Sequence, residues 1–421
     1  MKAFNTALTA YAVLISASQA QRSQVPACAI NCTKLAIAEL CALTDLRCMD
    51  TCTNAALQAK IGPCVETTCS IRESLTTKRL SDLKCGRPIR DRTKLISVTG
   101  VTGGGLALLA FALRMMARLP FFNGGQFGMD DVMIILAMVF TIPFSAFSVL
   151  IANAGLGKDI WHVAFDDITN ILYIYYFDEW LYFLALIFTK VSLHFFYLRI
   201  FSKKSFRIAI YVLMAITLAY GLVFILVSVF QCRPIELAWL RWDKTAPGHC
   251  NDINMQGWTS AGFNIVLDFV TLALPLRELS QLELWRKKKI HICLMFSVGS
   301  FVTIVSIFRL QTLLKFAKSH NFTWDYVEMG YWSTIEIHVG IICACMPAMR
   351  SFFRRVFPTL FSYTEHQKSG TFGTFSTSHD EAMMRNSERL SQKPKCHESD
   401  AMPLVDVVNF QQHQRNYFHA V

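Results

Sequence analysis

The sequence predicts an all-α membrane protein, a bundle of seven transmembrane helices preceded by a small disulfide-rich domain. Of the 421 residues, 53% are hydrophobic and only 17% are charged, a more apolar balance than soluble proteins have. Apolar segments of about 20 residues, long enough to cross roughly 30 Å of hydrocarbon, recur between Leu95 and Met349. The net charge of +11 therefore bears first on membrane topology, and we expect lipid contacts and no nucleic-acid partner.

The first 20 residues have the features of a secretory signal peptide. Met1 and Lys2 precede the apolar run LTAYAVLISA, and the small residues Ser18 and Ala20 form a cleavage site. We expect cleavage after Ala20. The alternative is a retained membrane anchor, for which the apolar run is short.

Residues 21–94 contain eight of the fourteen cysteines, in a segment too small to bury a large core. Behind a signal peptide, this count predicts four disulfides in an oxidising compartment, although eight cysteines allow about 105 pairings. A zinc module is the alternative, but the segment contains no histidine. The eight are Cys28, Cys32, Cys41, Cys48, Cys52, Cys64, Cys69 and Cys85.

Four stretches of this segment carry a family resemblance. They are PACAINC, CALTDLRC, CTN and CGRP, beginning at Pro26, Cys41, Cys52 and Cys85. In them the segment resembles the CFEM domain, the eight-cysteine module of fungal extracellular membrane proteins. The resemblance implies a helical extracellular domain. In the haem-binding branch of that family, the aspartate of the TD-x-x-C element is an axial haem ligand, which corresponds to Asp45.

Asp45 therefore has two interpretations. If it ligates haem iron, haem is a cofactor of this segment. The alternative is that its carboxylate caps a short helix by accepting backbone N–H bonds. The chain carries two more residues between Cys48 and Cys52 than the usual Cys-x-Cys of the family.

Seven spans are expected within residues 95–357, followed by a disordered cytoplasmic tail at 358–421. If residues 21–94 are extracellular, the basic clusters of the later segments, such as Lys203 with Lys204, fall in the cytoplasm, as the positive-inside rule requires. The basic residues from Arg87 to Lys94 would then lie outside, because a translocated domain follows its signal largely regardless of charge. We therefore expect a multi-pass protein of the plasma membrane with its C-terminus in the cytoplasm. The predicted spans are 95–117, 130–153, 174–199, 207–231, 257–279, 290–314 and 328–349.

Features of the predicted extracellular side agree with this orientation. Cys232 and Cys250 flank the second outer loop, where a disulfide is permitted, and a reduced pair is the alternative. Sequons predict glycosylation at Asn31 in the cysteine-rich segment and at Asn321 in the third outer loop.

Several polar residues inside the spans form a predicted intramembrane network. An ionisable group in hydrocarbon costs at least about 2.5 kcal/mol, so each needs a partner or a watery cavity. We expect the network to line a ligand pocket open to the outside or to form a charge lock that breaks on activation, and the alternative is that it only holds the helices together. Depth along the helices predicts an outer cluster, Glu179, Arg309 and Glu336, and a deeper group, Lys190, Asp268 and Asn264.

The spans also carry motifs of a known family. GLGKDIW, YLRIF, CRP and CACMP begin at Gly155, Tyr197, Cys232 and Cys343. They resemble the fungal seven-span rhodopsin-like membrane proteins named after a pathogenicity receptor. The resemblance implies a receptor-like protein of the cell surface that senses a surface, host or chemical cue, contributes to virulence and acts through a G protein or another cytoplasmic partner.

Two other functions also fit the sequence. One is a haem or iron uptake component, and the other is a membrane accessory protein of a secondary-metabolite gene cluster. No retinal cofactor is expected, because the last predicted span contains no lysine to attach it. We expect no enzymatic activity, since the chain lacks a glycine-rich phosphate loop, an HExxH motif and a plausible triad outside the spans.

Overall fold

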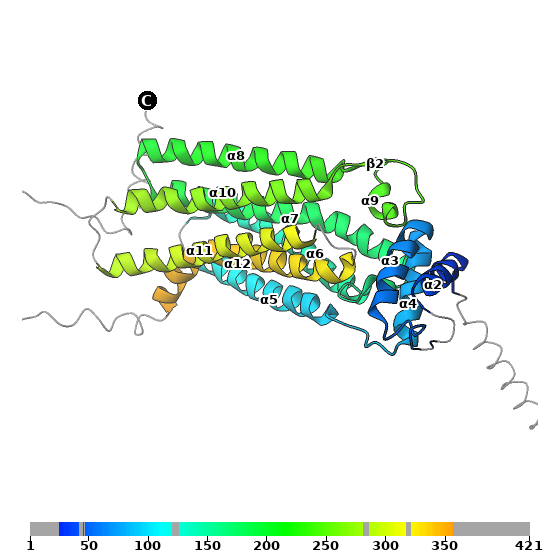
Figure 1. Cartoon of the computed structure of the whole chain (residues 1–421). Helices are drawn as coiled ribbons and strands as arrows, with labels where there is room; N and C mark the ends of the chain where they lie inside the picture. The colour runs from blue at the N-terminus through cyan, green and yellow to red at the C-terminus, as the bar shows by residue number, and fades with distance from the viewer. Residues whose placement is uncertain are drawn as a thin grey trace, which may run out of the picture. The chain divides into compact units, whose positions relative to one another are not determined.

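The computed structural model describes residues 25–41, 45, 47–119, 126–280, 286–316 and 321–356, which are largely helical (Figure 1). The expected signal peptide and the expected tail lie outside these residues. The chain divides into two compact units, Met1–Met115 with Gly128–Met349 and Met116–Phe127 with Arg350–Val421. The first unit contains every site discussed below.

The cysteine-rich segment, called the head below (residues 25–92), is helical as predicted. Asn54 starts its second helix by accepting a hydrogen bond from the backbone N–H of Leu57, and Ser70 with Glu73 forms a capping box on its third. The helices are α2 Ala27–Leu40, α3 Ala55–Thr68 and α4 Ile71–Lys84.

Disulfides supplement the small core of the head, which is centred on Ala29, Cys32 and Val65. The expectation that all eight cysteines pair is confirmed. Two of the bonds fasten α2 to the far end of α3. The pairs are Cys28–Cys69, Cys32–Cys64, Cys41–Cys48 and Cys52–Cys85.

The described residues contain seven helices long and apolar enough to cross a membrane, as predicted. They run side by side (Figure 1). Several continue past the predicted spans, because a helix keeps its backbone hydrogen bonds where it leaves the hydrocarbon. They are α5 Thr93–Arg118, α6 Met129–Asn153, α7 Phe165–Ile200, α8 Lys204–Val229, α10 Ile253–Ser280, α11 Arg286–Phe316 and α12 Phe322–Val356.

The helix α7 is the most enclosed of the seven. In the most apolar 18-residue stretch of α7, 67% of the residues are buried, whereas the corresponding values are 22% in α5 and 28% in α8. It begins at Phe165, nine residues before the predicted span. Asp166 and Asp167 lie in its first turn, where negative charges interact favourably with the helix dipole. Partners on several helices can therefore reach its polar side chains.

A short antiparallel pair of strands joins α8 to α10. Strand β1 Cys232–Arg233 pairs with β2 His249–Cys250, and the predicted Cys232–Cys250 disulfide links them. The loop between the strands contains the helix α9 Leu237–Leu240 and the turn η3 Arg241–Asp243.

Candidate functional site

Four charged side chains from four different helices meet inside the bundle. They are Lys190 of α7, Asp268 of α10, Arg309 of α11 and Glu336 of α12, and none is more than 8% exposed. Their formal charges balance, two positive against two negative. A single unpaired charge in hydrocarbon has a high free-energy cost, so these side chains must be paired to remain buried in the bundle.

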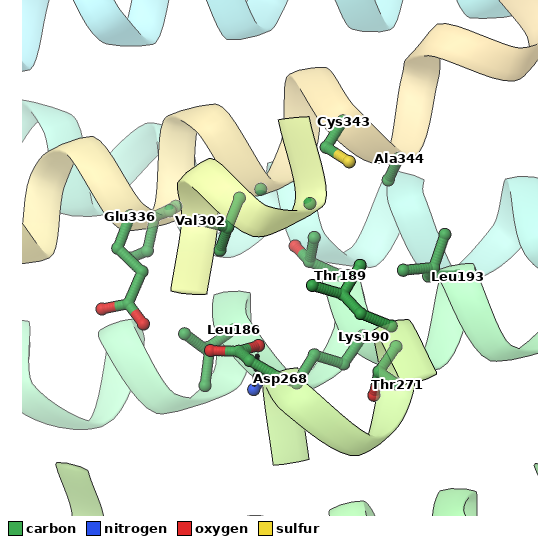
Figure 2. Close-up of a pocket in the computed structure, with 14 residues that line it drawn as sticks. Leu186, Thr189, Lys190, Leu193, Asp268, Thr271, Val302, Glu336, Cys343 and Ala344 are labelled. Atoms are coloured by element: carbon green, nitrogen blue, oxygen red, sulfur yellow. Dashed lines mark ion pairs between the residues drawn. The ribbon is translucent and has the colours of Figure 1, made fainter. Parts of the chain in front are cut away.

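Lys190 occupies one end of this set. Its Nζ lies 2.7 Å from Asp268 Oδ1 and donates to Asn264 Oδ1, also at 2.7 Å. Lys190 and Asp268 point toward each other along the wall of a cavity of about 60 Å³ (Figure 2). The structure thus brings the predicted deeper group together.

Glu336 connects the predicted deeper group to Arg309. Its Oε1 accepts from Asn264 Nδ2 at 2.6 Å and from Ser306 Oγ at 2.5 Å, while its Oε2 accepts from Tyr182 OH at 2.8 Å. The prediction of two separate layers was wrong here, because neutral amide and hydroxyl groups bridge them. Ser306 and Tyr182 were missed by sequence reasoning, and the one available signal was that Ser306 lies one turn from Arg309 on the same helix.

Arg309 pairs with Glu336 but is not fully satisfied. Its Nε lies 3.1 Å from Glu336 Oε2, and its guanidinium lies 4.9 Å from the centre of the Tyr182 ring. The angle at Nε is unsuitable for a hydrogen bond, so this contact with Glu336 is an ion pair only. Among the described residues, neither Nε nor Nη2 of Arg309 has a hydrogen-bond partner.

The placement of Glu179 corrects the predicted outer cluster. Its Oε1 accepts from Ser228 Oγ at 2.8 Å and from Gln256 Nε2 at 2.9 Å, and its Oε2 accepts from Gln231 Nε2 at 3.4 Å. Neutral donors of α8, of the segment just after it and of α10, and not Arg309, therefore satisfy this carboxylate. Glu179 and Arg309 nonetheless line the same second cavity, of about 80 Å³.

A further buried charge cluster was not predicted. Arg114 of α5, 1% exposed, has its Nη2 2.6 Å from Asp130 Oδ2, and its Nε donates to Asp131 Oδ1 at 2.9 Å. Its Nη1 donates to the Ala344 carbonyl of α12 at 2.6 Å, and Arg199 Nη1 lies 3.3 Å from Asp130. The sequence signal was a single arginine inside an apolar span, followed by two aspartates at the start of the next.

Ion pairs join the head to the loops between the long helices. Arg72 Nη2 lies 2.9 Å from Asp243 Oδ2, and the Trp161 indole N–H donates to Asp82 Oδ2 at 2.8 Å. Burial alone would raise the pKa of Asp243, but hydrogen bonds from Thr245 and Arg72 outweigh it and lower that pKa. The head is therefore attached by specific polar contacts as well as by the chain.

Asn321, the second predicted glycosylation site, belongs to the same set of contacts. Its Nδ2 donates to Asp159 Oδ1 at 2.7 Å, and its Oδ1 accepts from Ile160 N at 2.9 Å. Asp159 also pairs with Arg90 of the head. Thr323 of the sequon is fully buried, and glycosylation at Asn321 stays a prediction. Asn31 is exposed on α2, and its glycosylation stays a prediction.

Asp45 has the contacts of a turn cap. Its Oδ1 accepts from the backbone N–H groups of Arg47, at 3.0 Å, and Cys48, at 3.1 Å. This carboxylate oxygen accepts hydrogen bonds from two backbone N–H groups, which agrees with the capping role given above as the alternative to haem ligation. These contacts do not single Asp45 out as a haem ligand.

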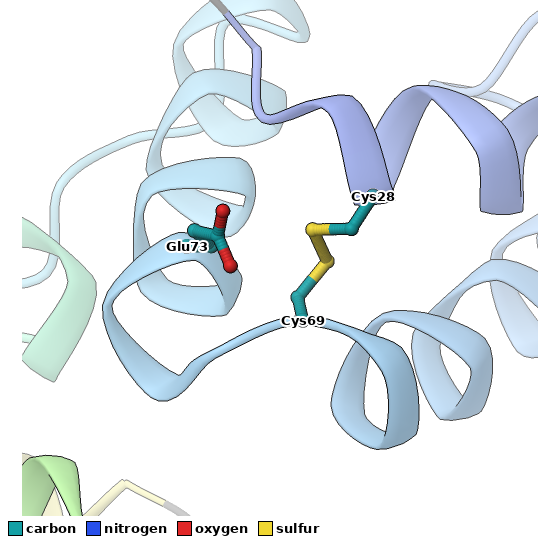
Figure 3. A group of neighbouring side chains, drawn as sticks. All are labelled: Cys28, Cys69 and Glu73. Atoms are coloured by element: carbon teal, nitrogen blue, oxygen red, sulfur yellow. A yellow bond between two sulfur atoms is a disulfide. The ribbon is translucent and has the colours of Figure 1, made fainter. Parts of the chain in front are cut away.

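One group of potential metal ligands occurs among the described residues of the head, Cys28, Cys69 and Glu73. Figure 3 shows that the two sulfur atoms are joined in a disulfide. They are therefore not thiolates, and Glu73 Oε2 is engaged by Ser70. The group does not fit a metal.

The chain matches the Fungal rhodopsin domain over residues 113–355 and the CFEM domain over residues 21–86. It is similar to a SAT4 family membrane protein of Emericella nidulans, 30% identical over 203 residues that cover 48% of this chain and 50% of that protein. No solved structure matches.

Other relatives carry two kinds of name. Receptor GIN3 of Arthrobotrys oligospora is 25% identical over 175 residues, 41% of each chain. Satratoxin biosynthesis SC1 cluster protein 4 of Stachybotrys chartarum is 26% identical over 165 residues, 39% of this chain and 59% of that protein. The matched region spans about half the length of these relatives. With the domain match covering more than half of its residues, this multi-pass membrane protein belongs to the fungal rhodopsin domain family and carries a CFEM domain ahead of its spans.

Proposed function

We propose that the protein is a receptor-like sensor of the plasma membrane, with its head outside the cell and its C-terminus in the cytoplasm. The head receives a surface, host or chemical cue, and the bundle relays the event to a G protein or another cytoplasmic partner. The observation that carries this proposal is the buried network of Lys190, Asp268, Glu336 and Arg309, which ties α7, α10, α11 and α12 together through charges.

Such a network suits a relay because its partners can be exchanged. Asn264 offers both a donor and an acceptor, and Ser306 Oγ lies within hydrogen-bonding distance of both Asp268, at 3.0 Å, and Glu336. A second arrangement of the same groups can satisfy the same charges, and an element with two such states is what a switch requires. The cavity beside Lys190 leaves room for side-chain movement.

The attachment of the head supports the same proposal. Its pairs with Asp243 and Asp159 contact the loop before α10 and the loop before α7. A cue that moves the head therefore acts directly on the ends of two helices of the network. The receptor name of one relative agrees with this role.

The test compares strains that lack the native gene and carry either the wild type or Lys190→Met with a fluorescent tag. We expect Lys190→Met to reach the plasma membrane and to lose the transcriptional response to contact with a host surface. Lys94→Met, which changes an exposed lysine of α5, is the matched control. A normal response from Lys190→Met at normal surface levels would show that the network only holds the helices together.

A second candidate function is favoured by the names of other relatives. Four of them, including proteins of Stachybotrys chartarum and Talaromyces wortmannii, are named as biosynthesis cluster proteins. In this case the protein would be a membrane accessory of a biosynthetic pathway. Metabolite profiles of the same strains separate the two functions, since a missing metabolite with an intact contact response would favour the accessory role.

A further inference from the structure

The cavity of about 80 Å³ is lined by an acidic and a basic side chain, each with a polar atom that has no hydrogen-bond partner among the described residues. They are Asp178 of α7 and Arg309 of α11. The other lining residues include the hydroxyl side chains of Ser260 and Ser333 and the ring of Tyr175. A cavity with one free carboxyl acceptor and one free guanidinium donor has the chemistry of a binding site.

Asp178 is the free acceptor. Its Oδ1 is inaccessible to solvent and has no hydrogen-bond partner among the described residues. The adjacent Glu179 also lines the cavity, but both of its oxygens already accept hydrogen bonds from neutral side chains. A buried carboxylate oxygen without a donor is costly, so a ligand that donates to it gains the full value of the contact.

Arg309 is the free donor. It is 4% exposed, and its Nη2 has no hydrogen-bond partner among the described residues, although the guanidinium pairs with Glu336 on another side. A cation alone would leave this N–H unsatisfied, and an anion alone would leave Asp178 unsatisfied. One small molecule that carries both charges satisfies the two groups together.

We propose that this cavity binds a small zwitterion of the amino-acid class, with its ammonium group on Asp178 and its carboxylate on Arg309. The volume limits the ligand to a few heavy atoms, since a water-sized group takes about 10–15 Å³. Such a ligand would be the chemical cue of the proposed sensor, so the biological role of the site rests on that proposed function. Binding itself is measurable without any signal.

The test is calorimetric titration of the purified full chain in lipid nanodiscs with glycine and alanine. Ethylamine supplies the cation alone, and acetate supplies the anion alone. We expect saturable binding of the amino acids, about tenfold or more tighter than either partial ligand, because one charged hydrogen bond is lost in each. Binding of ethylamine as tight as that of glycine would show that the carboxylate is not recognised and would overturn the proposal. No binding by any probe would also overturn it.

Two variants locate the binding. Asp178→Asn replaces the acceptor carboxyl by a neutral amide and should weaken amino-acid binding about tenfold or more. Ser333→Leu fills the cavity without changing a charge and should abolish binding even if Asp178→Asn folds poorly. Asp252→Asn is the control, because this exposed aspartate accepts from the N–H groups of Asn254 and Met255, which asparagine can also do.

Amino-acid binding that both cavity variants leave unchanged would overturn the proposal. Binding that both lose while the control keeps it would support the proposal. If the wild type binds amino acids but no cell response follows, the proposed sensor role fails and the binding site stands.

Discussion

The head and the helix bundle hold their helices together by different means. In the head, disulfides fix short helices around a core of a few small side chains. In the bundle, a large apolar core is crossed by buried ion pairs on separate helices. A disulfide holds one arrangement, whereas an ion pair can change partners. The difference predicts a rigid head and a bundle that can adopt more than one arrangement, and the following predictions sharpen this comparison.

The largest expected effect is in the bundle. Arg114→Met should lower the free energy of unfolding by about 3–5 kcal/mol, because two buried aspartates lose the same counter-ion. The thermal unfolding midpoint in nanodiscs measures it, with the exposed Lys94→Met as control. Unfolding of Arg114→Met at the wild-type temperature would show that the cluster contributes no stability.

The next effect is in the head and depends on loop length. Replacing Cys52 and Cys85 by serine opens a loop of 33 residues, and replacing Cys41 and Cys48 opens one of 7. In the chain-entropy model the losses are about 4 and about 2 kcal/mol. Protection of α3 and α4 from hydrogen exchange in the full chain measures them. Equal losses would mean that chain entropy does not set head stability.

A smaller effect concerns the attachment between the two regions. The lowered pKa of Asp243 means that its pair with Arg72 stabilises the folded chain above the usual aspartate pKa of about 3.9 and is lost as the pH falls through the lowered value. Because the Arg72 side chain is about half exposed, we expect about 1 kcal/mol. The difference in unfolding midpoint between wild type and Asp243→Asn should shrink from pH 6 to pH 3. A constant difference would exclude this pair as its cause.

The smallest effect is at Asp45. As a turn cap on an exposed loop, Asp45→Ala should cost about 0.5 kcal/mol of head stability, whereas Asp45→Asn should cost less. Hydrogen exchange at Arg47 and Cys48 reports the change. A haem titration of the same proteins sharpens the result, since a saturable Soret band that only Asp45→Ala removes would contradict a purely capping role.

Local composition along the chain was enough to predict the architecture of the protein. Apolar segment length predicts seven spans, and cysteine density behind an export signal predicts disulfides, because both depend on local composition. The pairing of Lys190 with Asp268 also followed from depth along two helices. The spans and the disulfides need no knowledge of which helices are neighbours, whereas the Lys190–Asp268 pair also required α7 and α10 to be adjacent.

Tertiary structure decided which partners each group has. Glu179 and Glu336 lie at similar expected depths, yet of the two only Glu336 forms an ion pair with Arg309. Glu179 instead accepts hydrogen bonds from Ser228 and Gln256, which lie on other helices. The same holds for Asn321, whose side-chain amide donates to Asp159, a residue far away in sequence. Depth is set along one helix, but contact is set by the rotation and packing of several, and a single sequence does not specify these.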